Sequence, residues 1–575
     1  MSVPLKKVER PRELSWFQAG AMLYGDWGTS KAYVLGIAFA LAGHASWFFL
    51  GIMAALTAMI GVCYTIICHI YPDGGGVYSS VRHTSRTLAV IGAFLLIADY
   101  VITVSLSTLD AFHYFNVPYP EKWAIVSILA IGILNWVGPT KTGSIAVIIG
   151  LLASCTAGIL FLSTLPSLPH VQLTWPTGGI MKNWSTFVGI VLALSGVEAI
   201  ANMTGIMKEP VRETSKKAIW PVLLEVSVLT FLLGIAMNAI PGLTDHTEDM
   251  LRAIAVHYIG PWYGVVISVV FGFLLLSAAN TAIGDLVSIQ FLMAKDRELP
   301  SGFLQLNRFG MPGLALIIAT AVPAFVLVIE HNIVGLASLY AIGVVGAITL
   351  NLGSCALNKN IQIEKRDRIL LGSGAFILAL IEITIIFEKR NALIYAVSVL
   401  GVGLALRYIA KTFVPMPVAL TLPAVEVLTV SEAKEIAPLY KSSSLVALKS
   451  LNLHLLDETA LRTRALGENS VYLSYVEETP PGRELPVDIE PSIESLKLLG
   501  EAQQEMEKRG ITAIPIWQFG GNPGKMIAIA ARELGVHTVM IGTTQRSALV
   551  NLLRGDVLRN LARSLPRECR LVISG

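Results

Sequence analysis

The chain has 575 residues, of which 54% are hydrophobic and only 14% are charged. Soluble domains carry about 25% charged residues, so this composition indicates a protein that lies in a lipid bilayer. A net charge of +3, without a basic cluster among aromatic residues, argues against a nucleic-acid partner. The five cysteines are scattered and show no metal-ligand spacing, so we expect them to be small core residues.

The first fifteen residues hold several basic side chains but no small-residue cleavage site, so we expect the first apolar stretch to remain in the membrane. A bilayer core of roughly 30 Å requires about 20 apolar residues per helix. Runs of that kind predict an α-helical polytopic membrane protein with twelve spans, near residues 16–42, 46–71, 88–114, 123–137, 144–165, 185–206, 219–240, 261–293, 312–330, 333–357, 369–387 and 391–411.

Lysine and arginine in the loops predict the orientation of these spans, because cytoplasmic loops carry an excess of both. With the N-terminus inside, the predicted cytoplasmic segments hold eighteen of these residues and the external segments hold five. We therefore expect both termini in the cytoplasm and a multi-pass protein of the plasma (inner) membrane.

After Lys411 the long apolar runs end and the sequence pattern changes to that of a soluble domain. Residues 1–411 form the predicted transmembrane transporter domain, residues 412–444 a proline-containing linker, and residues 445–575 a soluble domain. In the last part, helices such as 493–508 and 523–534 alternate with predicted strands near 445–448, 471–476, 511–517, 538–541 and 571–573. This alternation predicts βαβ units and a doubly wound α/β domain, with a parallel sheet covered on both faces.

Three carboxylates fall near the middle of predicted spans, at Asp26, Asp99 and Glu198. An ionisable side chain at the centre of a membrane helix costs at least about 2.5–3.5 kcal/mol, which makes each one a functional candidate. Asp26 and Glu198 stand beside glycines in the first and sixth spans. Glycine-interrupted helices at matching positions of two five-helix halves indicate a midplane cation site. Three other acids stand nearer to the span ends, and we expect them to be solvated: Asp73, Asp110 and Glu225.

The third span presents one polar face. Asp99, Thr103 and Ser107 are four residues apart, so they fall within roughly 80° of arc on a helix, with Tyr100 beside them. In the tenth span, Tyr340 could reach the same cavity. Single hydroxyls in membrane helices more often serve packing, so the prediction depends on the polar set as a whole.

Five segments carry a resemblance to a known group of transporters, at residues 26–33, 71–78, 99–103, 195–199 and 339–344. Together they resemble the amino acid–polyamine–organocation superfamily, and within it the KimA-type importers of the KUP potassium family. The resemblance covers roughly residues 10–410. It implies a transporter rather than an enzyme, with a LeuT-like fold of 5+5 inverted repeats plus two helices (12 TM).

The resemblance also implies a potassium–proton symporter, with Glu198 as the proton carrier. The residues that match the ion-site positions of these importers are Asp26, Tyr33, Asp99, Tyr100, Thr103, Ser107, Ser195, Glu198 and Tyr340. Ser195 stands where a threonine is usual and keeps the hydroxyl. Lys31 departs from the pattern more strongly, since it places a cation five residues from Asp26. It could pair with Asp26 and modulate the site, or it could turn towards the membrane surface.

The tail, especially residues 511–575, resembles the universal stress protein family and therefore a flavodoxin-like α/β fold. Nucleotide-binding members use a glycine-rich loop, because backbone N–H groups free of side chains cradle phosphate. Gly542 and Gly555 keep that spacing, but Gln545 and Asp556 replace a glycine and a hydroxyl. We expect a regulatory or dimerising domain that has lost nucleotide binding, with a homodimer formed through it and no cofactor. A regulatory nucleotide held at Gly542 and Gly555 is the alternative.

Two other functions stay open at this point. A proton-coupled amino acid or amine permease would share the fold but would need a less polar pocket, whereas three buried acids favour a cation. A non-transporting membrane sensor with a signalling tail would also fit the two domains, although nothing in the tail looks catalytic.

Overall fold

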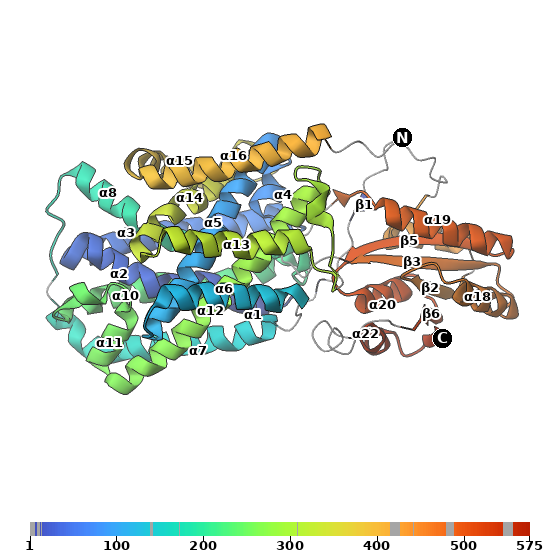
Figure 1. Ribbon diagram of the computed structural model, residues 1–575, viewed down its shortest axis with the longest axis horizontal. Helices are drawn as coiled ribbons and strands as arrows, with labels where there is room; N and C mark the ends of the chain where they lie inside the picture. The colour runs from blue at the N-terminus through green and yellow to red at the C-terminus, as the bar shows by residue number, and fades with distance from the viewer. Residues whose placement is uncertain are drawn as a thin grey trace.

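The computed structural model describes residues 6–7, 12, 14–137, 142–171, 173–307, 309–413, 426–440, 442–478, 488–543 and 556–574. It consists of a large helical domain and an α/β tail domain, which lies at one end of the helical domain (Figure 1). We refer to that end of the helices as the tail end and to the opposite end as the far end.

Each stretch predicted as a span contains a helix or a broken pair of helices. The long apolar helices are α1 (Trp16–Trp27), α2 (Ser30–Ala42), α3 (Ser46–Ile70), α5 (Arg86–Tyr114), α6 (Pro120–Val137), α7 (Thr142–Thr164), α10 (Val211–Ala236), α12 (Pro261–Lys295), α13 (Gly313–Ile329), α14 (Ile333–Leu357), α15 (Lys365–Glu388) and α16 (Arg390–Phe413). The shorter ones are α4 (Val77–Val81), α8 (Ile180–Ile190), α9 (Ala199–Asn202) and α11 (Met250–Tyr258).

By length and hydropathy, nine continuous helical segments among the described residues could cross a bilayer, and the first of these joins α1, α2 and α3. The chain is therefore a multi-pass membrane protein. The number of twelve spans stays a prediction.

Helix α5 is the centre of the helical domain. In its most apolar window 78% of the residues are buried, against 17% for α6 and α16. Helices α12 and α14 pack against α5, and the close approach of α14 depends on Gly343, where an added methyl group would lie 2.8 Å from the Asp99 backbone nitrogen. The polar residues of α5 are therefore held in the interior of the domain and away from lipid.

Two helices are interrupted where the sequence places glycines. The first break separates α1 from α2 at Gly28 and Thr29, and the Thr29 hydroxyl donates to the Asp26 carbonyl over 2.5 Å. The second lies between α8 and α9, where a 3-10 turn (Val191–Leu194) is followed by residues 195–198 in turn conformation. Both predicted helix breaks are thus present.

The tail domain has the predicted doubly wound class. Its parallel strands are β2 (Ser444–Leu448), β3 (Ser470–Glu478), β5 (Thr512–Gly520), β6 (Thr538–Gly542) and β7 (Arg570–Ser574), in the spatial order β5-β3-β2-β6-β7. Two separate hydrophobic clusters cover its two faces, with helices α18 (Leu453–Ala465) and α19 (Ile493–Lys508) on one and α17 (Val430–Ile436), α20 (Pro523–Glu533) and α22 (Val557–Ser564) on the other. The order differs from that of flavodoxin, because β3 and β5 both lie on one side of β2.

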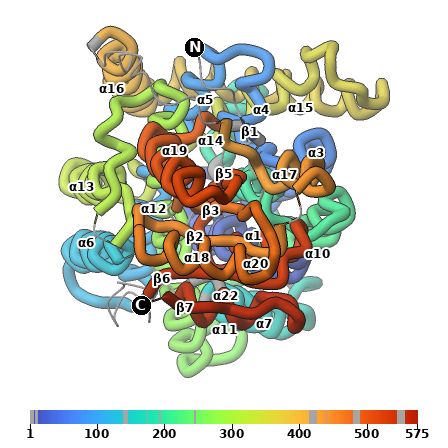
Figure 2. Tube along the Cα trace, turned by 90° about the vertical axis from the view of Figure 1, so that its right-hand side faces the viewer, coloured from blue at the N-terminus to red at the C-terminus, as the bar shows by residue number. Residues whose placement is uncertain are grey.

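The tail domain contacts the tail end of the helices directly, and Figure 2 shows its sheet in front of the middle of the helical domain. Strand β1 (Lys6–Lys7) pairs antiparallel with β4 (Asp488–Ile489) of the tail. Lys295, the last residue of α12, forms an ion pair with Glu477 at the end of β3, and both side chains are largely buried. Chain segments from both ends of the protein therefore meet at this contact.

Candidate functional site

The two helix breaks contact each other inside the domain. Gly196, in the second break, has a φ of +91°, a value that a residue with a side chain rarely adopts. A methyl group added at Gly196 would lie 2.7 Å from the backbone nitrogen of Trp27, at the end of α1. Gly196 is therefore needed both for the shape of its turn and for the close contact between the two breaks.

Three buried carboxylates gather around these breaks, and we call them the acid site: Asp26, Asp99 and Glu198. They are 8%, 1% and 2% exposed, and they lie within electrostatic range of one another. Glu198 accepts a hydrogen bond from the Gly196 N–H over 3.1 Å. Neither carboxylate oxygen of Asp99 has a hydrogen-bond partner in the described part of the chain. The acid site therefore combines three acids at a depth where an unbalanced charge is costly.

Hydroxyl groups from two helices lie beside the acid site. The Thr103 hydroxyl donates to the Asp99 carbonyl over 3.0 Å and lies 3.3 Å from the Tyr340 hydroxyl of α14. The Tyr100 hydroxyl accepts from the Asn202 side chain over 3.0 Å. The prediction that Tyr340 reaches the polar face of the third span agrees with this geometry.

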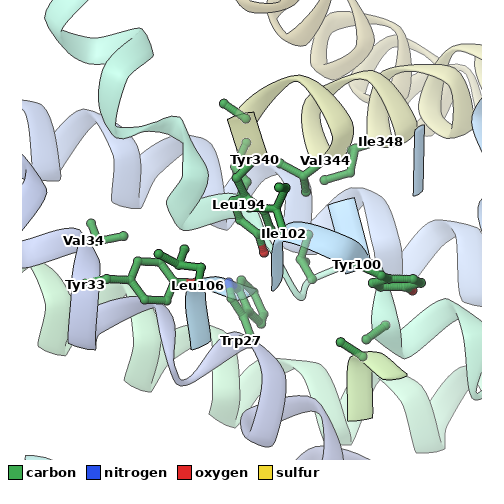
Figure 3. Packing of buried hydrophobic residues seen from close by; sticks show 14 of the residues in the cluster. Trp27, Tyr33, Val34, Tyr100, Ile102, Leu106, Leu194, Tyr340, Val344 and Ile348 are labelled. Carbon is green, nitrogen blue, oxygen red and sulfur yellow. The ribbon is translucent and has the colours of Figure 1, made fainter. Parts of the chain in front are cut away.

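Figure 3 shows the aromatic residues of this region, with Tyr33 of α2 and Tyr100 of α5 on opposite sides of Trp27. Ser107 and Ser195 are also buried, each 3% exposed, and Ser195 opens the turn of the second break. The structure thus places all nine predicted site residues in the buried interior of the helical domain. Their role in ion binding stays a prediction.

The outcome for Lys31 differs from both expectations. Its side chain is fully buried, and its ammonium lies 2.6 Å from Glu225 Oε2 of α10, so it neither reaches the membrane surface nor pairs with Asp26. The Tyr24 hydroxyl completes the cluster, 3.0 Å from the Lys31 ammonium and 2.9 Å from Glu225. We call this group the lysine pair. Lys31 is already neutralised by a partner outside the acid site.

The expectation that Asp110 and Glu225 are solvated is wrong. Asp110 is 0% exposed, and the Glu225 side chain is 16% exposed and belongs to the lysine pair. Neighbouring elements cover both positions: Asp110 lies one turn before Tyr114, which is hydrogen-bonded to α2, and Glu225 pairs with Lys31 of α2. Asp73 is more exposed and forms an ion pair with Arg12.

Two further acids, one buried and one partly buried, were missed by the sequence analysis although they lie within predicted spans. Asp285 of α12 is 6% exposed and lies within electrostatic range of Glu198 and Tyr100. Glu382 of α15 has one oxygen without a hydrogen-bond partner in the described residues. A search for every charged residue within the apolar runs would have found both.

No group of three or more His, Cys, Asp or Glu side chains that could jointly hold a metal occurs within the described ranges. The three carboxylates of the acid site are therefore not arranged as one chelating cluster. An ion held there would take ligands from fewer carboxylates together with hydroxyls and with carbonyls of the broken helices.

In the tail domain, Gly542 ends β6 next to β2, at the point where strand order reverses. Ligands of doubly wound sheets bind at this position. Asp556 caps α22 by accepting from the backbone N–H groups of Leu558 and Arg559. The predicted loop residues Gln545 and Gly555 lie outside the described residues, and nucleotide binding stays untested.

Comparisons with known proteins agree with this architecture. An amino acid permease family model matches residues 14–421, and the universal stress protein family model matches residues 445–572. The chain is 26% identical over 442 residues to the "Potassium transporter KimA" of Bacillus subtilis (strain 168), which covers 69% of this chain and 70% of that protein.

Two solved structures are similar in part. A universal stress protein from Archaeoglobus fulgidus is 18% identical and covers 23% of this chain and 97% of its own, with a TM-score of 0.19. The Eremococcus coleocola manganese transporter is 14% identical and covers 70% of this chain and 96% of its own, with a TM-score of 0.44. With a family model that spans most of its length, this chain is a membrane transporter that belongs to the amino acid permease family, and its tail matches the universal stress protein family.

Proposed function

We propose that the protein is a secondary active transporter that takes up potassium together with protons through the acid site. The observation that carries this proposal is the contrast between Asp99, which has no hydrogen-bond partner in the described residues, and Lys31, which is occupied by Glu225. Since Lys31 does not neutralise the acid site, a mobile cation or a proton is needed to balance it. The similarity to a potassium transporter supports the choice of potassium.

An amino acid or amine permease is the competing function, and the family description favours it. Such a substrate would need space and free backbone groups between the two helix breaks. At Gly196 the two breaks are so close that an added methyl group would lie within 3 Å of the Trp27 backbone. This packing, together with three acids, supports a small dehydrated cation. A non-transporting sensor has no observation in its favour.

In the proposed mechanism, Asp26 and Asp99 hold the cation with the hydroxyls of Tyr33, Thr103, Ser107 and Tyr340. Glu198 is the proton carrier, because it lies beside both acids and within the second break. A proton on Glu198 and a cation at its neighbours change the charge at one location, so the two occupancies are coupled. With the tail end in the cytoplasm, each positive charge that moves inward at 100 mV supplies about 2.3 kcal/mol for accumulation.

The tail domain is proposed to regulate transport and to form a homodimer. Its contacts at β1 and at Lys295 link it to the N-terminal strand and to the end of α12. We expect removal of residues 435–575 to leave transport possible but to change its regulation or the oligomeric state. Tight ATP binding, measured by calorimetry on the purified full-length protein with the tail-deleted protein as control, would contradict the loss of nucleotide binding.

The proposed function is tested by uptake into proteoliposomes that contain the purified full-length protein. We expect saturable rubidium uptake that competes with potassium and that increases when an inward proton gradient is imposed. The same vesicles are tested with a panel of amino acids and amines. Robust uptake of an amino acid without any potassium or rubidium flux would show that the competing function is correct.

A further inference from the structure

Asp110 is a buried acid that the proposed mechanism does not use. On a helix with 3.6 residues per turn, Asp110 lies within about 20° of Asp99 and roughly 16 Å further along α5. It therefore continues the polar face of Asp99, Thr103 and Ser107 towards the far end of the domain. It is 0% exposed, and neither of its carboxylate oxygens has a hydrogen-bond partner in the part of the chain that the structure describes.

Two tyrosines connect Asp110 to the surroundings of the acid site. Tyr33 of α2 lies within electrostatic range of both Asp26 and Asp110. Tyr114, one turn beyond Asp110 on α5, donates its hydroxyl hydrogen to the Ala32 carbonyl over 2.8 Å, so α2 and α5 are joined at this level. The phenol oxygens of both tyrosines retain lone pairs that can coordinate a cation.

Beyond Asp110 a polar cavity of about 620 Å³ opens at the far end, and we call it the outer vestibule. Its lining includes His113 at the end of α5 and two acids that lie within electrostatic range of Asp110, Glu248 and Asp249. His113 Nδ1 lies 2.8 Å from Glu248, and the hydrogen bond from that imidazole lowers the pKa of Glu248 although burial opposes the shift. Asp249 lies 2.9 Å from His246 Nδ1 and 3.6 Å from Arg252, so each vestibule acid lies beside a basic side chain of the same lining.

We propose that Asp110 forms an outer binding site for a monovalent cation, between the outer vestibule and the acid site. A carboxylate without a hydrogen-bond donor at this depth is balanced when it binds a dehydrated cation, and the polar vestibule opens towards it from the far end. Tyr33 lies within electrostatic range of both the outer site and Asp26. This inference rests on the proposed function and adds a second site to the same route.

The test measures rubidium uptake into proteoliposomes of the full-length protein as a function of rubidium concentration, separately at the far face and at the tail face. Asp110→Asn keeps the shape of the side chain and removes its charge. Loss of a buried charged ligand is expected to raise the apparent KM for rubidium at the far face by at least about tenfold. The KM at the tail face and the maximal rate are expected to stay near the parent values.

Two further variants serve as controls for Asp110→Asn. Thr108→Val is the matched control, because Thr108 is fully buried on the same helix and its hydroxyl donates only to backbone carbonyls of α5. It should leave both KM values unchanged. Asp110→Glu keeps the charge and should retain a KM within a few-fold of the parent. Asp110→Ser also removes the charge and serves in place of Asp110→Asn if that variant does not fold.

The outcomes separate this inference from the proposed function. Rubidium uptake by the parent protein tests the proposed function. The ratio of the variant's far-face KM to the parent's far-face KM tests the outer site. An Asp110→Asn protein with the parent's far-face KM would overturn the outer site. So would equal changes at both faces, or loss of all uptake in a folded protein, because either would place Asp110 in the central machinery.

Discussion

The broken first helix contributes to two buried charge clusters that are balanced in different ways. In the lysine pair, Lys31 and Glu225 neutralise each other over 2.6 Å. In the acid site, Asp99 has no hydrogen-bond partner in the described residues, and its charged neighbours are themselves acids. The comparison indicates that buried charge alone does not identify a transport site. The cluster that lacks its own counter-charge is the one that needs a mobile ion.

The substitution with the largest expected effect is one that breaks the lysine pair. Lys31→Met leaves Glu225 as an uncompensated buried charge, and removing one partner of a buried ion pair costs about 3–5 kcal/mol. We expect a large drop in the thermal unfolding temperature of the detergent-solubilised protein. The double variant Lys31→Met with Glu225→Met should recover most of that stability, because an apolar pair of similar volume needs no counter-charge.

If Lys31→Met alone keeps the parent's unfolding temperature, the lysine pair contributes nothing to stability. If the double variant also folds but shifts the KM for rubidium strongly, Lys31 acts on the acid site after all. Either result would remove the distinction between the two clusters.

The next effect concerns the acid site itself. Asp99→Asn keeps the side-chain shape but removes a carboxylate that has no hydrogen-bond partner to lose among the described residues. We expect rubidium affinity to fall at least about tenfold, which corresponds to about 1.4 kcal/mol, with little change in protein stability. Binding is measured by competition with potassium on purified protein. An unchanged affinity would mean that Asp99 is not a ligand.

A third effect tests the contact between the helix breaks. Gly196→Ala introduces a side chain at a φ of +91° and 2.7 Å from the Trp27 backbone nitrogen, so we expect a loss of about 1–3 kcal/mol in stability together with reduced transport. Gly158→Ala is the matched control, because no heavy atom lies within 4 Å of its added methyl group. Equal behaviour of the two variants would contradict the proposed role of Gly196.

The smallest effect concerns the ion pair between the tail and α12. Burial alone would raise the pKa of Glu477, but Lys295 and hydrogen bonds from Trp517 and Ser492 outweigh it, so its pKa is lowered from the usual 4.5. The stabilisation is therefore complete above pH 4.5 and is lost as the pH falls below that value. Between pH 6 and 8 this contact should not titrate.

Glu477→Gln is expected to increase hydrogen exchange of β4 and of the last turn of α12 while transport continues. Lys449→Met is the matched control, because Lys449 pairs with the neighbouring Glu478 but its side chain is 78% exposed. Exposed pairs contribute little, about 0–1 kcal/mol, so exchange should not change. Loss of transport in Glu477→Gln would show that the tail does more than regulate.

Much of this architecture could be predicted because it depends on local patterns. The apolar runs gave the helix positions, and helical periodicity placed Asp99 and Thr103 on one face, where both now lie beside Tyr340. The partner of Lys31 could not be predicted, since Glu225 is 194 residues away and the contact depends on how α2 packs against α10. Asp110 was misjudged because the buried length of α5 depends on the helices around it.

The most direct test of the central claim is proton-driven rubidium accumulation by Glu198→Gln in proteoliposomes with an imposed pH gradient. Glu382→Gln is the matched control, since Glu382 is also a glutamate in an apolar helix but lies on α15 and is not part of the acid site. We predict that Glu198→Gln loses uphill accumulation but retains rubidium exchange, while Glu382→Gln accumulates like the parent. Uphill accumulation by Glu198→Gln at the parent's rate would contradict the account.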